Sequence, residues 1–286
     1  MRVRRAALVV KLTALRALGE GRAGAGAPLR PLVAGDREHR RTLEAVRAAL
    51  AARRIRFDEI AGHRLTPPAA RRIGAADLVI AVGGDGTLLA ASHHVTSGAL
   101  LGVNSAPGDS VGHFCSADRG SVAEALDAIL ASSRRPAWLA RLRLLLGGRE
   151  LPRALNDALV VHACPAATTR YRLRVGAREE TQRSSGIWIA TAAGSTAGIL
   201  SAGGRAMPAR SRRLQYRVRE LYREPGRRYA LTGSVLPEGA GIVIESRMPE
   251  GRVYVDGSRL AFDFPFGSRL VARIDPAPLA LFVMPS

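Results

Sequence analysis

Cysteine and long apolar runs are scarce in this chain of 286 residues. Its two cysteines, Cys115 and Cys164, are too few for a disulfide scaffold, so we expect a reducing compartment, the cytoplasm. No apolar run is long enough to cross a bilayer, which argues against a membrane partner. The basic start of the chain imitates a leader, but residues 6–12 are needed as a first strand, and we expect no removable segment.

Lysine and aromatic residues are also rare, although the net charge is +19. Lys11 is the only lysine, so the other basic residues are arginines, and aromatic residues make up 5% of the chain. The arginines are dispersed and are not interleaved with aromatic residues, whereas nucleic-acid binding uses basic residues gathered on one surface. We therefore expect no nucleic-acid partner, and we assign the charge to a solvated surface that attracts small anionic ligands.

Strand and helix patterns alternate in the first part of the chain. Residues 78–82, Leu-Val-Ile-Ala-Val, are typical of a strand buried on both faces of a parallel sheet. Residues 36–54 and 121–132 have apolar residues at helical spacing. This alternation predicts a doubly wound α/β domain over residues 1–135. We also expect strands at 6–12, 55–60 and 100–104, a loop at 19–36, and a short helix after Thr66-Pro67-Pro68.

The pattern then changes to short strands separated by turn signals such as Asp256-Gly257. This change predicts an all-β domain, a β-sandwich, over residues 136–274. The last apolar stretch, residues 279–284, suits a return of residues 275–286 to the first domain. The expected strands of the second domain are 138–146, 154–163, 171–175, 186–191, 214–221, 241–245, 253–255 and 269–274.

A glycine-rich motif, Gly-Gly-Asp-Gly-Thr at residues 83–87, follows the buried strand and precedes a helix expected from Leu88. Three glycines in four residues let backbone N–H groups approach an anion at the positive end of that helix. Asp85 would repel phosphate there unless a metal or a substrate hydroxyl needs it. The motif therefore points to phosphoryl transfer. Lys11 ends a strand at the same sheet edge and can reach a phosphate, although a solvated lysine is the favoured interpretation.

Two further motifs lie in the second half of the chain. Asn156 and Asp157 stand at the start of a strand, where both can accept hydrogen bonds from vicinal ribose hydroxyls; Asn-Asp is also a common turn dipeptide. Residues 191–198 have only small side chains, so a flat ring can lie against their backbone while Ser195 and Thr196 offer hydroxyls. A helix N-terminus capped by Ser195 is an alternative compatible with that role.

In their order along the chain, these motifs resemble those of the NAD kinase family. The resemblance implies an α/β domain followed by a β-sandwich, Mg²⁺ as cofactor, and a homodimer or homotetramer. It also implies transfer of the γ-phosphoryl group of ATP to the adenosine-ribose 2′-hydroxyl of NAD, which gives NADP. The matching residues are Gly-Gly-Asp-Gly-Thr at 83–87, Gly-Val-Asn at 102–104, Asn156-Asp157, Gly-Ser-Thr-Ala at 194–197 and Ser-Ala-Gly-Gly at 201–204.

The resemblance also implies roles for individual residues. Asp85 becomes the base toward the 2′-hydroxyl or an indirect ligand of Mg²⁺. Asn156 and Asp157 hold the nicotinamide-side ribose. The remaining implied positions are Gly83, Gly84, Gly86, Thr87 and Asn104 for the phosphates of ATP, and Ser195, Thr196, Ala197 and Ser201 for NAD.

The chain departs from the family pattern at several positions, and in this it resembles a divergent branch of the family. The family commonly has Asn-Glu where Asn156-Asp157 stands, and Thr-Pro-Thr at residues 191–193. It often has a tyrosine at Gly198, an acidic residue at Ser185 and an aromatic residue at His113. Two alternatives therefore stay open: a lipid or other small-alcohol kinase that shares the first motif, and a non-catalytic NAD(P) sensor.

Overall fold

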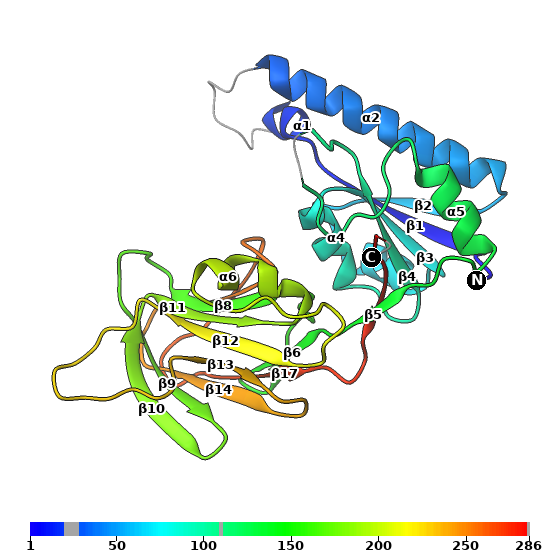
Figure 1. Ribbon diagram of the computed structural model, residues 1–286. Coiled ribbons are helices and arrows are strands. Elements are labelled where there is room, and N and C mark those ends of the chain that lie inside the picture. Colours follow the sequence, from blue (N-terminus) through cyan, green and yellow to red (C-terminus); the bar gives the residue numbers. More distant parts are fainter. Residues whose placement is uncertain (20–28, 109–110, 285–286) are drawn as a thin grey trace. The chain divides into compact units, whose positions relative to one another are not determined.

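The computed structural model describes residues 1–19, 29–108 and 111–284, and the chain forms two compact units (Figure 1). The first unit comprises Met1–Ala137 and Leu279–Ser286, and the second comprises Trp138–Pro278. The first unit is α/β and the second is built from antiparallel sheets, so the predicted fold class is confirmed. No helix within the described ranges is long and apolar enough to cross a membrane.

A six-stranded sheet organises the first unit, with strand order β2-β1-β3-β4-β18-β5. Its central strands β3 (Leu78–Gly83) and β4 (Ala99–Asn104) are buried at every residue, and they pair in parallel. The uninterrupted apolar run of β3 is therefore explained by burial on both faces of the sheet. The other strands are β1 (Arg5–Val10), β2 (Arg56–Ala61), β5 (Ala137–Leu139) and β18 (Leu279–Phe282).

The long helix α2 (Leu29–Ala52) corrects one expectation, because it begins inside the stretch 19–36 that was expected as a loop. Residues 20–28 of that stretch lie outside the described residues. Pro31 falls in the first turn of α2, where a backbone N–H is not needed for the helix ladder, so proline does not prevent this early start. The other helices of this unit are α1 (Ala14–Gly19), α3 (Pro67–Gly74), α4 (Asp85–Ser92) and α5 (Val122–Leu130).

The second unit contains two six-stranded sheets, ordered β10-β9-β14-β17-β6-β7 and β13-β12-β11-β8-β15-β16. Alternate residues point into one shared apolar core, for example Ile242 and Ile244 of β14 and Ile187 and Ile189 of β11. This period of two, repeated on both sheets, is what the sandwich architecture requires.

The strands of the sandwich have the following bounds. The first sheet contains β6 (Leu142–Leu146), β7 (Arg149–Glu150), β9 (Thr169–Val175), β10 (Arg178–Ser184), β14 (Gly241–Ser246) and β17 (Arg269–Ile274). The second contains β8 (Asp157–His162), β11 (Gly186–Ala190), β12 (Leu214–Arg219), β13 (Gly233–Leu236), β15 (Gly251–Val255) and β16 (Leu260–Asp263).

The last strand, β18, pairs in parallel with β4 in the sheet of the first unit. Phe282 of β18 is fully buried in the core of that unit, and its carbonyl accepts a hydrogen bond from Ser116 Oγ at 2.5 Å. The neighbouring carbonyl of Val283 accepts one from the guanidinium of Arg134 at 3.0 Å. The end of the chain is thus held both by apolar packing and by side-chain donors.

The first testable prediction concerns this closing strand. Phe282→Ala should lower the free energy of unfolding by about 3–5 kcal/mol, because a fully buried ring leaves a cavity that its neighbours cannot fill. Urea denaturation followed by circular dichroism measures the change. The matched control is Phe266→Ala, since Phe266 is 63% exposed and should be close to neutral. Equal effects of the two substitutions would contradict the docking of β18.

Candidate active site

The glycine-rich motif joins β3 to α4 at the carboxyl edge of the parallel sheet. Gly84 is the N-cap residue of α4 in an extended conformation, so the helix begins at Asp85 and not at Leu88 as expected. As a glycine, this N-cap residue has no side chain to cap the helix. The Thr87 N–H donates to the Gly84 carbonyl at 2.9 Å, so a ligand would bind at the N–H groups of Asp85 and Gly86. A Cβ atom on Gly86 would meet no described atom within 4 Å, so there is open space beside the motif.

Gly83 has a packing role in addition to the predicted one. A Cβ atom there would lie 2.4 Å from Oγ1 of the buried Thr87 and 3.0 Å from Cβ of Lys11. Any side chain at this position would displace both neighbours. The close approach also shows that Lys11, whose backbone N–H donates to the Val82 carbonyl at 3.0 Å, lies directly beside the motif.

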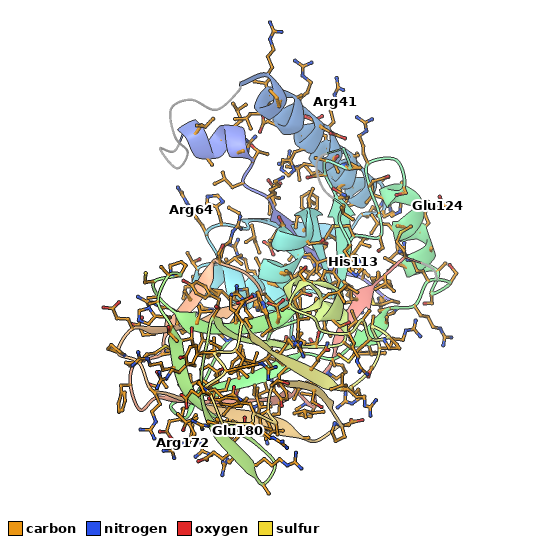
Figure 2. All side chains as sticks on the ribbon, turned by 60° about the vertical axis from the view of Figure 1, so that its left-hand side comes forward. Arg41, Arg64, His113, Glu124, Arg172 and Glu180 are labelled. Atoms are coloured by element: carbon orange, nitrogen blue, oxygen red, sulfur yellow. The ribbon has the colours of Figure 1, made fainter. Side chains whose placement is uncertain are left out.

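Asp85 ties the motif to the loop after β4. Its Oδ2 accepts the backbone N–H of His113 at 2.9 Å, and its Oδ1 accepts that of Phe114 at 2.8 Å. Phe114 is buried, whereas His113 is exposed and is labelled in Figure 2. Because each carboxylate oxygen can accept two hydrogen bonds, one N–H per oxygen leaves acceptor capacity for a hydroxyl or a metal-bound water.

Asn104 ends β4 and shapes the same loop. Its Oδ1 accepts the N–H of Ala106 at 3.2 Å, and its side chain is buried. A Cβ atom on Gly112 would lie 2.5 Å from the amide nitrogen of Asn104, and Gly112 has φ +59°, so glycine is required on both counts. Asn104 therefore supports the loop that holds Asp85, and its contact with the phosphates of ATP stays a prediction.

A second cluster forms in the sandwich, where Asn156 precedes β8 and Asp157 begins it. Asn156 is half-buried and Asp157 is 5% exposed. Burial, first, and the nearby charge of Asp256, second, raise the pKa of Asp157 to about 7. The Asp256 carboxylate accepts the N–H groups of residues 155–157 at 2.8, 2.7 and 3.0 Å.

The carbonyl groups of this segment are engaged from the other side. Thr191 Oγ1 donates to the Leu155 carbonyl at 2.6 Å, and the Thr191 N–H donates to the Asn156 carbonyl at 3.0 Å. A Cβ atom on Gly194 would lie 2.0 Å from the Asn156 carbonyl oxygen, so only glycine fits here. The Gly-Ser-Thr-Ala motif and the Asn156-Asp157 pair are thus packed against each other in this unit.

Ser195 is hydrogen-bonded inside the fold, and its predicted contact with NAD stays a prediction. It lies in the short 3₁₀ helix η1 (Ala193–Thr196), where its hydroxyl donates to the Ala192 carbonyl at 2.7 Å and accepts the Met207 N–H at 2.8 Å. The N-cap residue of the following helix α6 (Gly198–Ser201) is Ala197, so the expected cap by Ser195 is wrong. Ser195 is fully buried, and Thr196 and Ser201 are exposed.

Gly198, where a tyrosine is common in the family, lies against Trp188. A Cβ atom on Gly198 would lie 2.9 Å from Cζ2 of the indole, so a larger residue would displace that ring. Trp188 is half-buried on β11. The indole ring of Trp188 therefore lies directly beside residue 198, where this chain has glycine and the family often has tyrosine.

Two residue groups were missed by the sequence analysis. The sequence pattern indicates only that Asp256 belongs to an Asp-Gly turn. Nothing in the neighbouring sequence indicates that its carboxylate accepts the N–H of Asn156, which is 100 residues away. The His113 and Phe114 N–H groups were missed because backbone donors carry no sequence signal. Among the described residues, no group of three or more His, Cys, Asp and Glu side chains could hold a metal by itself.

The sequence and the fold of the chain are similar to those of known proteins. The family description "ATP-NAD kinase N-terminal domain" matches residues 45–133. A probable NADH kinase of Oryza sativa subsp. japonica is 37% identical over 272 residues, covering 87% of this chain and 82% of the rice protein. The structure of an Archaeoglobus fulgidus NAD kinase in complex with ATP has a TM-score of 0.71 at 19% identity, over 97% of this chain and 93% of that one. The structure of yeast NADH kinase complexed with NADH has a TM-score of 0.75 at 15% identity, and the match covers 100% of this chain and 85% of the yeast chain.

The α/β unit followed by a β-sandwich is the two-unit fold that the chain shares with these two solved structures. The identity to the rice protein over most of both chains goes further. The chain belongs to the NAD kinase family.

The raised pKa of Asp157 generates a prediction about stability. An aspartate in an unfolded chain has a pKa of about 3.9, so ionising Asp157 opposes folding increasingly as pH rises from about 4 to about 7. Asp157→Asn removes this cost. The stability of the variant relative to the natural protein should therefore rise by about 2–3 kcal/mol between pH 5 and pH 8, measured by urea denaturation.

Asp118→Asn is the matched control for this experiment. Hydrogen bonds from Ser121 and Gly120 lower the pKa of Asp118, so its carboxyl is ionised at both pH values in the folded and the unfolded chain. The loss caused by Asp118→Asn should therefore be the same at pH 5 and pH 8. A pH-independent effect of Asp157→Asn would show that Asp157 ionises normally.

Proposed function

We propose that this protein transfers the γ-phosphoryl group of ATP to the adenosine-ribose 2′-hydroxyl of NAD or NADH, forming NADP or NADPH. The observation that carries the proposal is the position of Asp85 at the start of α4. Its carboxylate is held by the N–H groups of His113 and Phe114, and there is open space beside it at Gly86. The relatives are named both as NAD kinases and as NADH kinases, so both acceptors belong in the test.

The phosphates of ATP would bind at the glycine-rich motif. Phosphoryl transfer depends on positioning and charge neutralisation more than on covalent chemistry. The uncapped N–H groups at the start of α4 and the helix dipole favour an anion there, and Lys11 lies beside Gly83 to add a positive charge.

Asp85 would act on the acceptor hydroxyl. With one N–H on each oxygen, its carboxylate is held in a single orientation while keeping acceptor capacity to take a proton from the 2′-hydroxyl. A carboxylate with unused acceptor capacity also suits Mg²⁺, which usually binds through substrate phosphates, waters and one or two carboxylates. When bound, this ion would neutralise phosphate charge.

The acceptor dinucleotide would use the second cluster. Asn156 and Asp157 would accept hydrogen bonds from the two hydroxyls of its nicotinamide-side ribose. The adenine would lie against Thr196, which is exposed, and Ala197, which is half-buried. Ser195 would support this surface from below, because its hydroxyl is already used inside the fold.

One assay with separate arms tests the proposal. The protein is incubated with Mg²⁺ and ATP together with NAD, NADH or a diacylglycerol, and the products are identified by mass spectrometry. We expect a phosphorylated dinucleotide and no phosphorylated lipid. Phosphorylation of the lipid alone would favour the lipid-kinase alternative, and dinucleotide binding without any product would favour a sensor; either result overturns the proposal.

The role of Asp85 gives a further prediction. Asp85→Asn should lower kcat by about a hundredfold or more, because the amide keeps one acceptor for the loop but cannot take a proton. The thermal midpoint and the dissociation constant for NAD should change little.

Asp118→Asn is again the matched control, since Asp118 also accepts two backbone N–H groups, those of Gly120 and Ser121 at 2.9 Å each. Its kcat should stay close to that of the natural protein. A kcat of Asp85→Asn as high as that of the control would remove Asp85 from the chemical step.

A further inference from the structure

Asp256 makes an unusual set of contacts at the turn between β15 and β16. Its Oδ2 accepts the N–H of Leu155, and its Oδ1 accepts the N–H groups of both Asn156 and Asp157. Its own backbone N–H donates to the Asp157 carbonyl at 2.9 Å. A single side chain therefore accepts the hydrogen bonds of three consecutive residues immediately before and at the start of β8.

This arrangement is costly for the fold. Asp256 has φ +49°, in the left-handed region that non-glycine residues seldom adopt. Its carboxylate also lies near that of Asp157, which is buried, and two like charges repel each other in such a place. Asparagine would tolerate the same φ without the charge. Only a carboxylate, however, offers two acceptor oxygens to three N–H groups.

The opposite side of the same segment is also held. Thr191 binds the Leu155 and Asn156 carbonyls, and Gly194 packs on Asn156 so closely that no side chain would fit. With its N–H groups bound by Asp256 and these carbonyls bound by Thr191, the backbone of residues 155–157 has little freedom. The directions in which the Asn156 and Asp157 side chains leave the backbone are therefore set by residues distant in sequence.

We propose that Asp256 is a positioning residue of the dinucleotide site. By holding the backbone of residues 155–157, it orients Asn156 and Asp157 so that together they accept hydrogen bonds from two vicinal hydroxyls of a ribose. A carboxylate placed beside a buried carboxyl is typical of functional sites, where such like-charge pairs are arranged. The identity of the ligand rests on the proposed function, whereas the backbone contacts do not.

Asp256 has a second, electrostatic effect on the same pair. Its charge is one of the two causes that raise the pKa of Asp157, the other being burial. An ionised Asp157 is the better acceptor for ribose hydroxyls, so NAD affinity should rise as pH increases from 6 to 8. Removing the charge of Asp256 lowers the pKa of Asp157, and the rise should then move to lower pH.

Steady-state kinetics of two variants test the proposal. Asp256→Ala removes all the acceptors, so KM for NAD should rise about tenfold or more, with KM for ATP within about twofold of the natural value. Asp256→Asn keeps Oδ1 for Asn156 and Asp157, so it should recover most of the NAD affinity at pH 8 and flatten the pH dependence of KM for NAD between pH 6 and 8. Because asparagine tolerates the positive φ, this variant also serves if Asp256→Ala does not fold.

Asp263→Ala is the matched control, because it removes an exposed carboxylate from β16, the other strand of the same hairpin. Asp263 pairs with Arg252, and its loss should leave both KM values unchanged. Equal rises of KM for NAD and ATP in Asp256→Ala would overturn the positioning role, and an unaltered pH profile in Asp256→Asn would overturn the electrostatic effect on Asp157. If the natural protein neither binds nor phosphorylates NAD, the proposed function is overturned instead. In that case, hydrogen exchange of the amides of residues 155–157 in Asp256→Ala still reports whether Asp256 holds that backbone.

Discussion

Aspartate carboxylates that accept consecutive backbone N–H groups hold the loops of the candidate sites in both units. Asp85 accepts the N–H groups of residues 113–114, and Asp256 accepts those of residues 155–157. A loop cannot pair its own donors as a strand ladder does, and a buried unpaired N–H is costly. In each unit, one aspartate side chain supplies the missing acceptors, and the geometry of the candidate site depends on it.

These contacts attach the candidate sites to two stable cores, although the residues of the sites themselves reduce stability. The two apolar cores supply the driving force for folding, one beneath the parallel sheet and one between the sheets of the sandwich. Against that background the fold tolerates a buried carboxyl at Asp157, a second carboxyl near it, and a positive φ at Asp256. The surplus of arginine adds little stability through exposed ion pairs, but it attracts small anionic molecules to the protein.

Several elements were predictable because their signals are local. The strand β3 and the alternating strands of the sandwich follow from side-chain periodicity. Strand β10 was missed, since its inward positions are the polar Gln182 and Ser184. They are satisfied by the hydroxyl of Tyr171 on the neighbouring strand, at 3.1 and 2.8 Å, so the apolar alternation that marks a strand is absent here.

By itself, the sequence determined the class of each half of the chain and the position of its glycine-rich motif, because periodicity and the lack of Cβ atoms are properties of neighbouring residues. It identified Asp85 and the Asn156-Asp157 pair without showing what holds them. Tertiary structure alone decided that β18 pairs with β4, that Asp85 binds the loop at residues 113–114, and that Asp256 organises residues 155–157. Each of these contacts joins segments far apart in the chain, and their partners are chosen by strand order and register, which no local pattern encodes.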